Sequence, residues 1–361
     1  MSESQSLDAI VSHFQINGEF VGANPYGSGH INDTFCIIFD QSGLVIRYIL
    51  QRINRKIFTN PIALMENIER VTSHIASRIT EDAGRRVLSL VPTRESTPSY
   101  EDEDGNHWRV YRFIEDARTY DAVESPEQAF QAAKAFGSFQ KLLADLPLPR
   151  LHDTIPDFHH TPKRYEYLQK TISVDTVNRA AFAKREIDFV LRRGSMVSVL
   201  IDASLPERVT HNDTKFNNVM LDDQTGEGIC VIDLDTVMPG LALYDFGDMV
   251  RTTTSTSRED ELDLSKVKME FAMFQSLVTG YLSSAGEFLS KEEVQYLVFS
   301  SKLITLEQAI RFLADHLAGD IYYKVHHDTH NLDRCRTQLK LFESIEQQEN
   351  AMERLVASIA S

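Results

Sequence analysis

The chain has 361 residues with 42% hydrophobic and 25% charged side chains, a length and balance that suit a globular protein of two lobes or domains. Its formal net charge of −16 argues against nucleic acid as a partner, because binding to a phosphate backbone requires a basic surface. The three widely spaced cysteines form no disulfide or zinc pattern, the N-terminus lacks signal-peptide features and no apolar run is long enough for a membrane, so we expect a cytoplasmic protein without membrane contact.

The first part of the chain is predicted to be rich in β-strands. Apolar and β-branched residues favour strands at 20–22, 34–39, 44–50 and 108–114, and an acidic turn at 101–105 precedes the last strand as in a hairpin. Glycines lie between the first two strands, and a helix is expected after Pro61. These elements predict a small, strand-rich N-terminal lobe over residues 1–113.

The second part of the chain is predicted to be mainly helical. Ser125, Pro126 and Gln128 form a helix-start signal with a capping box, and Ser290 with Glu293 repeats the capping signature. The helix that starts at Ser290 is expected to run on to a stop at Gly319. Two short apolar runs, 218–221 and 229–232, are joined by a turn and predict one hairpin. The sequence therefore predicts an α+β protein of two lobes, with a hinge at 114–118 and a larger helical lobe over 119–361.

Polar side chains at the two ends of this hairpin are candidates for chemistry. Asp213 precedes the hairpin, Asn218 begins its first strand and Asp233 follows its second strand. Because a hairpin brings its own ends together, we expect Asn218 and Asp233 to meet. Amide and carboxylate oxygens suit Mg²⁺, which also binds phosphate oxygens. Asp213 would then accept the proton of an attacking hydroxyl.

The alternative is that these are ordinary turn residues, since Asn and Asp favour turns. Four features weigh against it: His211 precedes the loop, the hairpin has a suitable length, a glycine loop lies between strands upstream, and the lobes come in the expected order. Residues His211, Asp213, Asn218 and Ile232-Asp233 resemble the motifs of the aminoglycoside phosphotransferase and choline kinase family. That resemblance implies a protein-kinase-like fold and the use of ATP and Mg²⁺. Asn212 departs from the family, which carries glycine there.

Two further aspartates near the hairpin need interpretation. Asp245-Phe246-Gly247 has the letters of the metal-binding motif of protein kinases, but it follows Pro239-Gly240 and not a buried strand. We therefore expect Asp245 to cap a helix or to bond back to the catalytic loop. Asp235 is a candidate for a second metal ligand, with a structural role as the alternative.

The sequence indicates the residues of the nucleotide site less clearly. Glycines can bend tightly over phosphates, so the loop with Gly27, Ser28 and Gly29 is a candidate phosphate loop. The lysine expected on the third strand is absent, and Gln51 or Arg52 stands near its place; Arg52 is the predicted phosphate cation, with Lys56 too far along the chain. The remaining predicted contacts are the helix acid Glu69, for which a solvated charge is the alternative, and the hinge residues Phe113 and Glu115.

A closer resemblance concerns the acceptor. The segments 25–32, 48–51, 211–218, 232–236, 311–315 and 319–322 look like those of the N-acetylhexosamine 1-kinases. This resemblance implies phosphorylation of the C1 hydroxyl of N-acetylglucosamine or N-acetylgalactosamine, with the sugar contacted by His30, Asp213, Thr236, Arg311 and Tyr322. From the residues alone, Arg311 could instead pair with Asp315 one turn on, Tyr322 could pack in the core, and His30 could be a turn residue.

The resulting expectation is a monomeric kinase that uses ATP and Mg²⁺ on a small-molecule sugar. Two rivals remain open. One is the same machinery acting on another hydroxyl, as in an aminoglycoside, choline or a different sugar. The other is a nucleotide-binding pseudokinase, which only the missing third-strand lysine supports.

Overall fold

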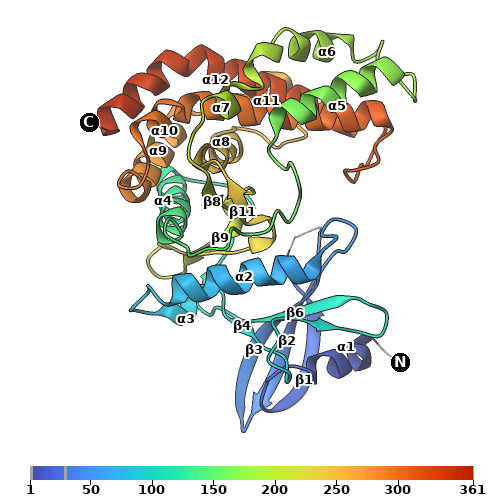
Figure 1. Ribbon diagram of the computed structural model, residues 1–361, viewed down its shortest axis with the longest axis vertical. Coiled ribbons are helices and arrows are strands. Elements are labelled where there is room, and N and C mark those ends of the chain that lie inside the picture. The colour runs from blue at the N-terminus through green and yellow to red at the C-terminus, as the bar shows by residue number, and fades with distance from the viewer. Residues whose placement is uncertain (1–2, 28–30, 361) are drawn as a thin grey trace.

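The computed structural model describes residues 3–27 and 31–360, which form two lobes stacked along the long axis (Figure 1). In the described residues, the N-terminal lobe holds a six-stranded antiparallel sheet in the order β1-β2-β3-β6-β4, with β5 paired to β6. Its elements are α1 (Glu3–Val11), β1 (Glu19–Pro25), β2 (Asp33–Gln41), β3 (Leu44–Arg52), α2 (Pro61–Ala76), α3 (Ala83–Arg86), β4 (Leu90–Val91), β5 (Tyr100–Glu101) and β6 (His107–Arg112).

The two faces of this sheet have different partners, because side chains alternate along a strand. Tyr48 and Leu50 of β3 pack with Leu7 and Val11 of α1 on the outer face. Ile49 points the other way and packs into the core that contains α2. The inner face of β3, with Arg47, Ile49 and Gln51, therefore looks toward α2 and the second lobe.

The connection between the lobes is short. Residues 113–116 follow β6, and β7 (Ala117–Arg118) already pairs with β9 of the second lobe. The backbone N–H of Phe113 donates to the carbonyl of Arg47 at 3.3 Å, so the connection begins against β3.

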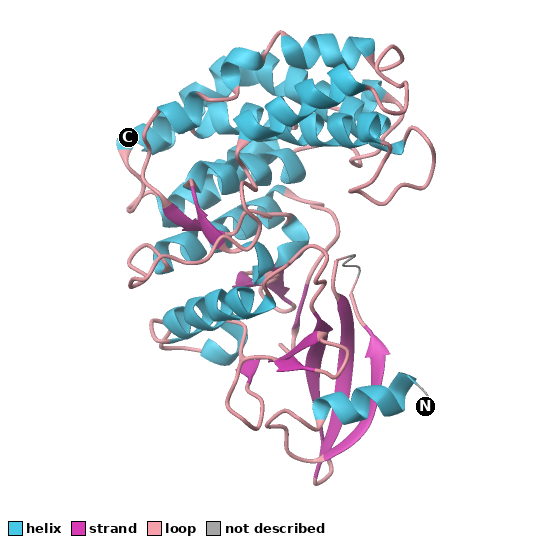
Figure 2. Cartoon of the chain, turned by 45° about the vertical axis from the view of Figure 1, so that its right-hand side comes forward, coloured by secondary structure: helices cyan, strands magenta, loops and turns pink. Residues whose placement is uncertain are grey.

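The C-terminal lobe is mainly helical, as predicted (Figure 2). Its long helices α11 and α12 pack together, α11 also packs against α5 and α8, and α4 packs against α9. Its elements are α4 (Pro126–Leu142), α5 (Thr161–Val174), α6 (Lys184–Leu191), η1 (Gly194–Met196), α7 (Val199–Asp202), β8 (Arg208–Thr210), η2 (Phe216–Asn218), β9 (Val219–Asp222), β10 (Gly228–Val231), η3 (Leu234–Thr236), β11 (Met238–Gly240), α8 (Ala242–Thr253), η4 (Leu264–Lys266), α9 (Phe271–Ala285), α10 (Lys291–Gln295), α11 (Leu297–Ala318) and α12 (His330–Ala360).

Both helix-start signals mark the start of a helix, but only the capping box at Ser290 is complete, because the side chain of Gln128 accepts from the backbone N–H of Glu124 and not from that of Ser125. Ser125 caps α4 by accepting from the backbone of Gln128, and Ser290 forms a complete capping box with Glu293. The prediction of one long helix from Ser290 to Gly319 is wrong, because the chain leaves helical geometry at Tyr296 and α10 and α11 are separate. Gly319 ends α11 at φ 98°, in the left-handed region that glycine adopts without strain.

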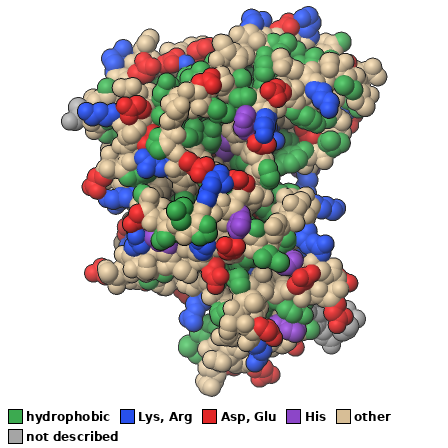
Figure 3. Space-filling view, in the orientation of Figure 1, with side chains coloured by type: hydrophobic (Ala, Val, Ile, Leu, Met, Phe, Trp, Pro, Cys, Tyr) green, Lys and Arg blue, Asp and Glu red, His purple; other side chains and the backbone are tan. Residues whose placement is uncertain are grey.

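The predicted α+β architecture of two lobes is thus confirmed. None of the helices in residues 3–27 and 31–360 combines the length and the apolar character that crossing a bilayer would require. On the face drawn in Figure 3, basic and acidic side chains are interspersed and no continuous basic patch is visible.

Candidate active site

The catalytic loop, residues 211–218, is held in place by hydrogen bonds to Asp245. This carboxylate is fully buried at the start of α8 and accepts the backbone N–H groups of His211 at 2.9 Å and Asn212 at 2.7 Å. Gln140 of α4 donates a third bond at 2.6 Å. The predicted return bond from Asp245 to the catalytic loop is confirmed, and both carboxylate oxygens of Asp245 already accept hydrogen bonds.

Asn212 explains how the loop tolerates the loss of the family glycine. Its φ is 65°, in the left-handed region that asparagine enters more readily than most residues. Its side-chain amide donates to the carbonyls of Thr210 at 3.2 Å and Thr236 at 2.9 Å. A side chain that bonds both flanking segments thus stabilises a backbone turn that glycine would only permit.

Asp213 lies at the end of this turn, next to a cation. Its carboxylate forms an ion pair with Lys215 at 2.8 Å, and the amide of Asn218 donates to its backbone carbonyl at 2.8 Å. Burial by itself would raise the pKa of Asp213, but the charges of Lys215 and His211 outweigh it, so the pKa lies below its ordinary value. Asp213 is therefore a carboxylate at neutral pH.

Asn218 and Asp233 come together across the hairpin, as the spacing predicts. Val231 pairs with Val219, and the N–H of Ile232 donates to the carbonyl of Asn218 at 2.9 Å. Asp233 follows directly, with φ at 58°. Withdrawal from bulk water, followed by the negative charges of Asp235 and Asp213, raises the pKa of Asp233 to about 6.

The surroundings of Asp233 suit a cation. Within the described part of the chain, no arginine or lysine forms an ion pair with it, whereas two carboxylates repel it. No group of three or more His, Cys, Asp or Glu side chains among the described residues is arranged to hold a metal. An amide and a carboxylate oxygen are compatible with Mg²⁺, which is commonly bound through one or two carboxylates and completed by phosphates and water.

Asp235 does not lie open to a metal. Its side chain is buried and forms an ion pair with Arg109 of β6, while the amide of Asn32 donates to its other oxygen at 2.6 Å. The structure thus favours the structural alternative for Asp235, because both carboxylate oxygens already have partners from the N-terminal lobe.

The predicted nucleotide contacts divide into two groups. Gly27 has φ at 80° and begins the loop between β1 and β2, while Ser28, Gly29 and His30 lie outside the described residues. Phe113 and Glu115 lie at the connection between the lobes, where the guanidinium of Arg47 stacks 3.9 Å from the Phe113 ring and pairs with Glu115.

Two other predicted nucleotide contacts are not brought to the site. Arg52 pairs with Asp33 and lies over Trp108, on the outer face of the sheet. Glu69 is exposed on α2 and forms no ion pair in the described structure. Instead, the buried cation of the N-terminal lobe is Arg109, which also donates to Gln51 at 2.9 Å.

A pocket of about 310 Å³ lies beyond the catalytic loop, between α5, α11 and the segment that follows α11. Arg311 and Arg164 both line it, together with Tyr167, Ala314, Asp315, Ile321, Tyr322 and Tyr323. Glu307 lies on α11 one turn before Arg311, and its carboxylate bonds His159. His159 in turn bonds the carbonyl of Asn212 in the catalytic loop. The helix that carries Arg311 is thus connected by hydrogen bonds to the residue that precedes Asp213.

The charges in this pocket are unbalanced. Asp315 does not pair with Arg311; its carboxylate accepts the backbone N–H groups of 321–323 and the amide of Asn331. Arg311 contacts Gln308 at 3.3 Å and the ring of Phe158, and Arg164 donates to a backbone carbonyl. Neither guanidinium has a carboxylate partner among the described residues, so the pocket offers hydrogen-bond donors and positive charge.

The other predicted acceptor contacts are placed differently. Tyr322 is 57% exposed and lines the pocket with its ring against Tyr323. Thr236 is buried, and its hydroxyl donates to the carbonyl of His211 at 2.7 Å, so it supports the catalytic loop from behind.

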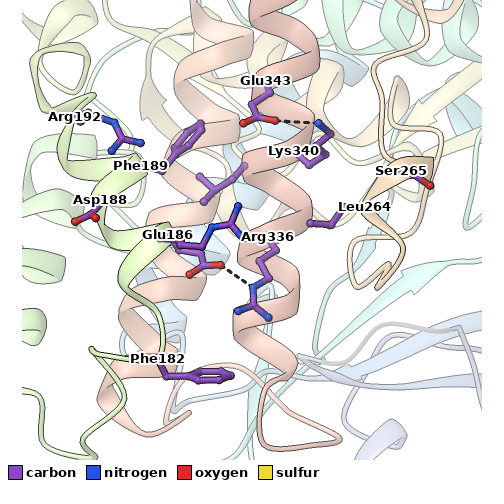
Figure 4. A pocket seen from close by; sticks show the side chains of 12 residues that line it. Phe182, Glu186, Asp188, Phe189, Arg192, Leu264, Ser265, Arg336, Lys340 and Glu343 are labelled. Carbon is purple, nitrogen blue, oxygen red and sulfur yellow. Dashed lines mark hydrogen bonds and ion pairs between the residues drawn. The ribbon is translucent and has the colours of Figure 1, made fainter.

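A larger cavity, of about 690 Å³, lies elsewhere, between α6, η4 and α12 (Figure 4). Its charged side chains include two ion pairs, Arg336 with Glu186 at 2.7 Å and Lys340 with Glu343 at 3.1 Å, and two arginines, Arg185 and Arg192, without an ion pair among the described residues. None of the hairpin or catalytic-loop residues lines it. No residue of the hairpin or the catalytic loop lines the smaller pocket either, so its candidacy rests on the bonds that connect α11 through Glu307 and His159 to Asn212.

Comparison with known proteins agrees with this geometry. Residues 22–271 match the family model described as the phosphotransferase enzyme family. The chain belongs to this family. Three solved structures share its two-lobed, protein-kinase-like fold at low sequence identity. A spectinomycin phosphotransferase in complex with ADP and spectinomycin has 14% identity and a TM-score of 0.59 (99% of this chain and 97% of that one), a microcompartment-associated aminopropanol kinase has 15% and 0.58 (97% and 98%), and choline kinase from Cryptosporidium parvum has 13% and 0.55 (99% and 99%).

Sequence reasoning missed three residues of this candidate site. Lys215 stands two residues after Asp213, and this spacing was the available signal. Arg164 carries no signal, because only the packing of α5 against α11 brings it to Arg311. His159 reads as part of a helix start, a role that its neighbour His160 in fact takes by capping α5.

Proposed function

We propose that this phosphotransferase is a kinase that transfers the γ-phosphoryl group of ATP to the C1 hydroxyl of an N-acetylhexosamine, N-acetylglucosamine or N-acetylgalactosamine. The observation that supports this acceptor best is the pair of arginines without carboxylate partners, Arg164 and Arg311, in the pocket beside α11, the helix connected by hydrogen bonds to the catalytic loop. The sequence resemblance at Arg311 and Tyr322 adds to it.

The pocket argues against a cationic acceptor. Spectinomycin, aminopropanol and choline, named with the three similar structures, are all amines or quaternary ammonium compounds. A positively charged group would meet two guanidiniums here, and the nearby Asp315 carboxylate is already saturated by backbone N–H groups. A neutral sugar instead presents hydroxyls and an acetamide carbonyl, which accept hydrogen bonds from arginine. Tyr322 and Tyr323 would provide flat apolar surface for the ring.

Asp213 is suited to orient the acceptor hydroxyl. Because its pKa is low, it would act on the C1 hydroxyl as a carboxylate, accepting the hydroxyl proton as the oxygen–phosphorus bond forms and the bond from phosphorus to the ADP oxygen breaks. Lys215 holds this carboxylate in place and would carry positive charge toward the transferred group. A carboxylate with a low pKa is a weak base, so positioning is expected to contribute more than proton removal.

Asn218 and Asp233 would hold Mg²⁺, which when bound neutralises charge on the phosphates. The loop that begins at Gly27 would cover the phosphates, and the backbone near Phe113 and Glu115 would meet adenine. Arg52 is not part of this proposal, since it lies on the outer face of the sheet.

An ADP-release assay with Mg-ATP tests the acceptor over five compounds: N-acetylglucosamine, N-acetylgalactosamine, glucose, choline and kanamycin. We expect turnover on at least one N-acetylhexosamine and none on choline or kanamycin. Turnover on another compound with none on either N-acetylhexosamine would refute the acceptor while leaving the kinase activity. ADP release on none of the five, despite ATP binding measured by calorimetry, would favour the pseudokinase.

A further inference from the structure

His159 ties the catalytic loop to two helices of the C-terminal lobe. It is 8% exposed and lies just before α5. Its Nε2 is 3.1 Å from the carbonyl oxygen of Asn212, and its Nδ1 is 2.7 Å from a carboxylate oxygen of Glu307 on α11. Thr161, in the first turn of α5, donates its hydroxyl to the other oxygen of Glu307 at 2.5 Å. Three segments far apart in the sequence thus meet beside Asp213.

The partners determine which atoms carry protons. A backbone carbonyl only accepts, so Nε2 of His159 must donate to Asn212. Burial alone would lower the pKa of His159, but the carboxylate of Glu307 outweighs it and the pKa is raised. Burial would likewise raise the pKa of Glu307, but His159 outweighs it and the pKa is lowered. Both shifts favour the imidazolium–carboxylate form of the pair, in which both ring nitrogens donate.

The bonded carbonyl belongs to the peptide that links Asn212 to Asp213. The N–H of Asn212 is held by Asp245, and its side chain bonds Thr210 and Thr236. After its N–H and its side chain, the carbonyl is the third polar group of Asn212. Rotation of the peptide plane that contains this carbonyl would change the direction of the Asp213 side chain. A displacement of about 1 Å at a reacting group can cost about 100-fold in rate.

We propose that His159 and Glu307 are positioning residues, which fix the peptide before Asp213 and thereby the direction of its carboxylate. This inference rests on the proposed role of Asp213 in phosphoryl transfer, but it does not depend on which acceptor is used. Neither residue would touch the acceptor or ATP. The expected signature is therefore a loss of kcat with little change in KM.

The test compares variants that differ in which bonds they keep. His159→Phe retains a planar ring but donates nothing, and we expect kcat to fall about 100-fold with both KM values within about threefold. His159→Gln places one amide donor near Asn212 and should recover part of the loss. Glu307→Leu removes the acceptor of both the His159 Nδ1 proton and the Thr161 hydroxyl, so kcat should fall in the same direction as in His159→Phe, with little change in either KM. The matched control is His160→Phe, which removes only a helix cap.

A second readout does not require turnover. Hydrogen–deuterium exchange of residues 208–218 should rise in His159→Phe and Glu307→Leu and stay at the wild-type rate in His160→Phe. A purely structural role predicts a lower urea midpoint for His159→Phe, unchanged kcat and unchanged exchange of this loop, and that result would overturn the proposal. If wild type turns over none of the acceptors, the proposed function fails and the exchange data alone decide the positioning claim. If His159→Phe does not fold, the kcat and exchange of His159→Gln decide it, and wild-type values there refute it.

Discussion

Arg109 and Asp235 form a buried ion pair that joins the two lobes two residues beyond Asp233. Arg109 lies on β6 and also donates to Gln51 of β3, while Asn32, after the β1 strand, donates to the second oxygen of Asp235. Three segments of the N-terminal lobe thus converge on one carboxylate of the C-terminal lobe. The lysine expected on the third strand is absent. A buried positive charge is present instead on the neighbouring strand β6, where Arg109 pairs with Asp235.

We predict that Arg109→Leu destabilises the protein strongly. Removing one partner leaves the Asp235 carboxylate buried without its counter-charge, which costs about 3–5 kcal/mol in other proteins. Urea unfolding followed by circular dichroism measures the change. The control is Arg52→Leu, whose pair with Asp33 is exposed and should contribute about 1 kcal/mol or less. Equal effects of the two substitutions would mean that the buried pair does not hold the lobes together.

We predict that Asp213→Asn removes most of kcat and leaves nucleotide binding intact. The amide can neither accept the proton nor keep the ion pair with Lys215, and loss of such a group costs about 100- to 10,000-fold. Steady-state kinetics give kcat, and calorimetry with ADP gives the affinity. As a control, Asp223→Asn changes a carboxylate in the distant hairpin turn, which pairs with Arg118, and should leave kcat unchanged. Near-normal kcat in Asp213→Asn would show that Asp213 does not orient the acceptor.

The sequence predicts those parts of the site that local geometry determines. Asn218 and Asp233 meet because one short hairpin carries both. Asp245 bonds back to the catalytic loop as predicted, although Pro239 and Gly240, which we expected to interrupt the chain before it, form part of β11. The prediction that Arg52 contacts phosphate was wrong because side chains alternate along β3, so a shift of one residue exchanges the inner face of the sheet for the outer face. Gln51, its neighbour, faces inward.

Other parts depend on long-range packing that no local pattern encodes. Arg109 and Asp235 are 126 residues apart, and His159 and Glu307 are 148 apart. Each of these side chains could equally be an exposed charge when judged from its own segment. Only the packing of the two lobes, or of α5 on α11, decides that they are buried together.

We predict that Arg311→Met and Arg164→Met raise the KM for the acceptor by about tenfold or more, since a lost hydrogen bond to a charged group costs about 1.5–3 kcal/mol. The KM for ATP should stay within the error of measurement. Methionine keeps much of the apolar stem, so packing against Phe158 should change little. Arg185→Met, in the larger cavity, is the control for loss of a positive charge. A rise in the KM for ATP alone would place these arginines outside the acceptor pocket.

We predict that the contribution of His159 to the pH dependence of the unfolding free energy reverses sign when Glu307 is replaced by glutamine. In the wild type, Glu307 overcomes the effect of burial and raises the pKa of His159 above its ordinary value of 6.5; Arg311 opposes this and Asp248 supports it. The folded state then holds the proton more tightly than the unfolded state, so the contribution of His159 is fully present below pH 6.5 and is lost as the pH rises through the folded pKa.

In Glu307→Gln the counter-charge is gone and burial prevails, so the pKa of His159 should fall below 6.5. The unfolded state then binds the proton more tightly, and the contribution of His159 to stability should increase as the pH rises toward 6.5 and above. Urea unfolding of both proteins between pH 5 and 8.5 measures this, and the difference in unfolding free energy, wild type minus Glu307→Gln, should fall steadily across the range. His160→Phe, carried through the same series, should follow the wild-type slope. A difference that stays constant with pH would mean that His159 does not change its protonation state with Glu307 and that the pair is not an imidazolium and a carboxylate.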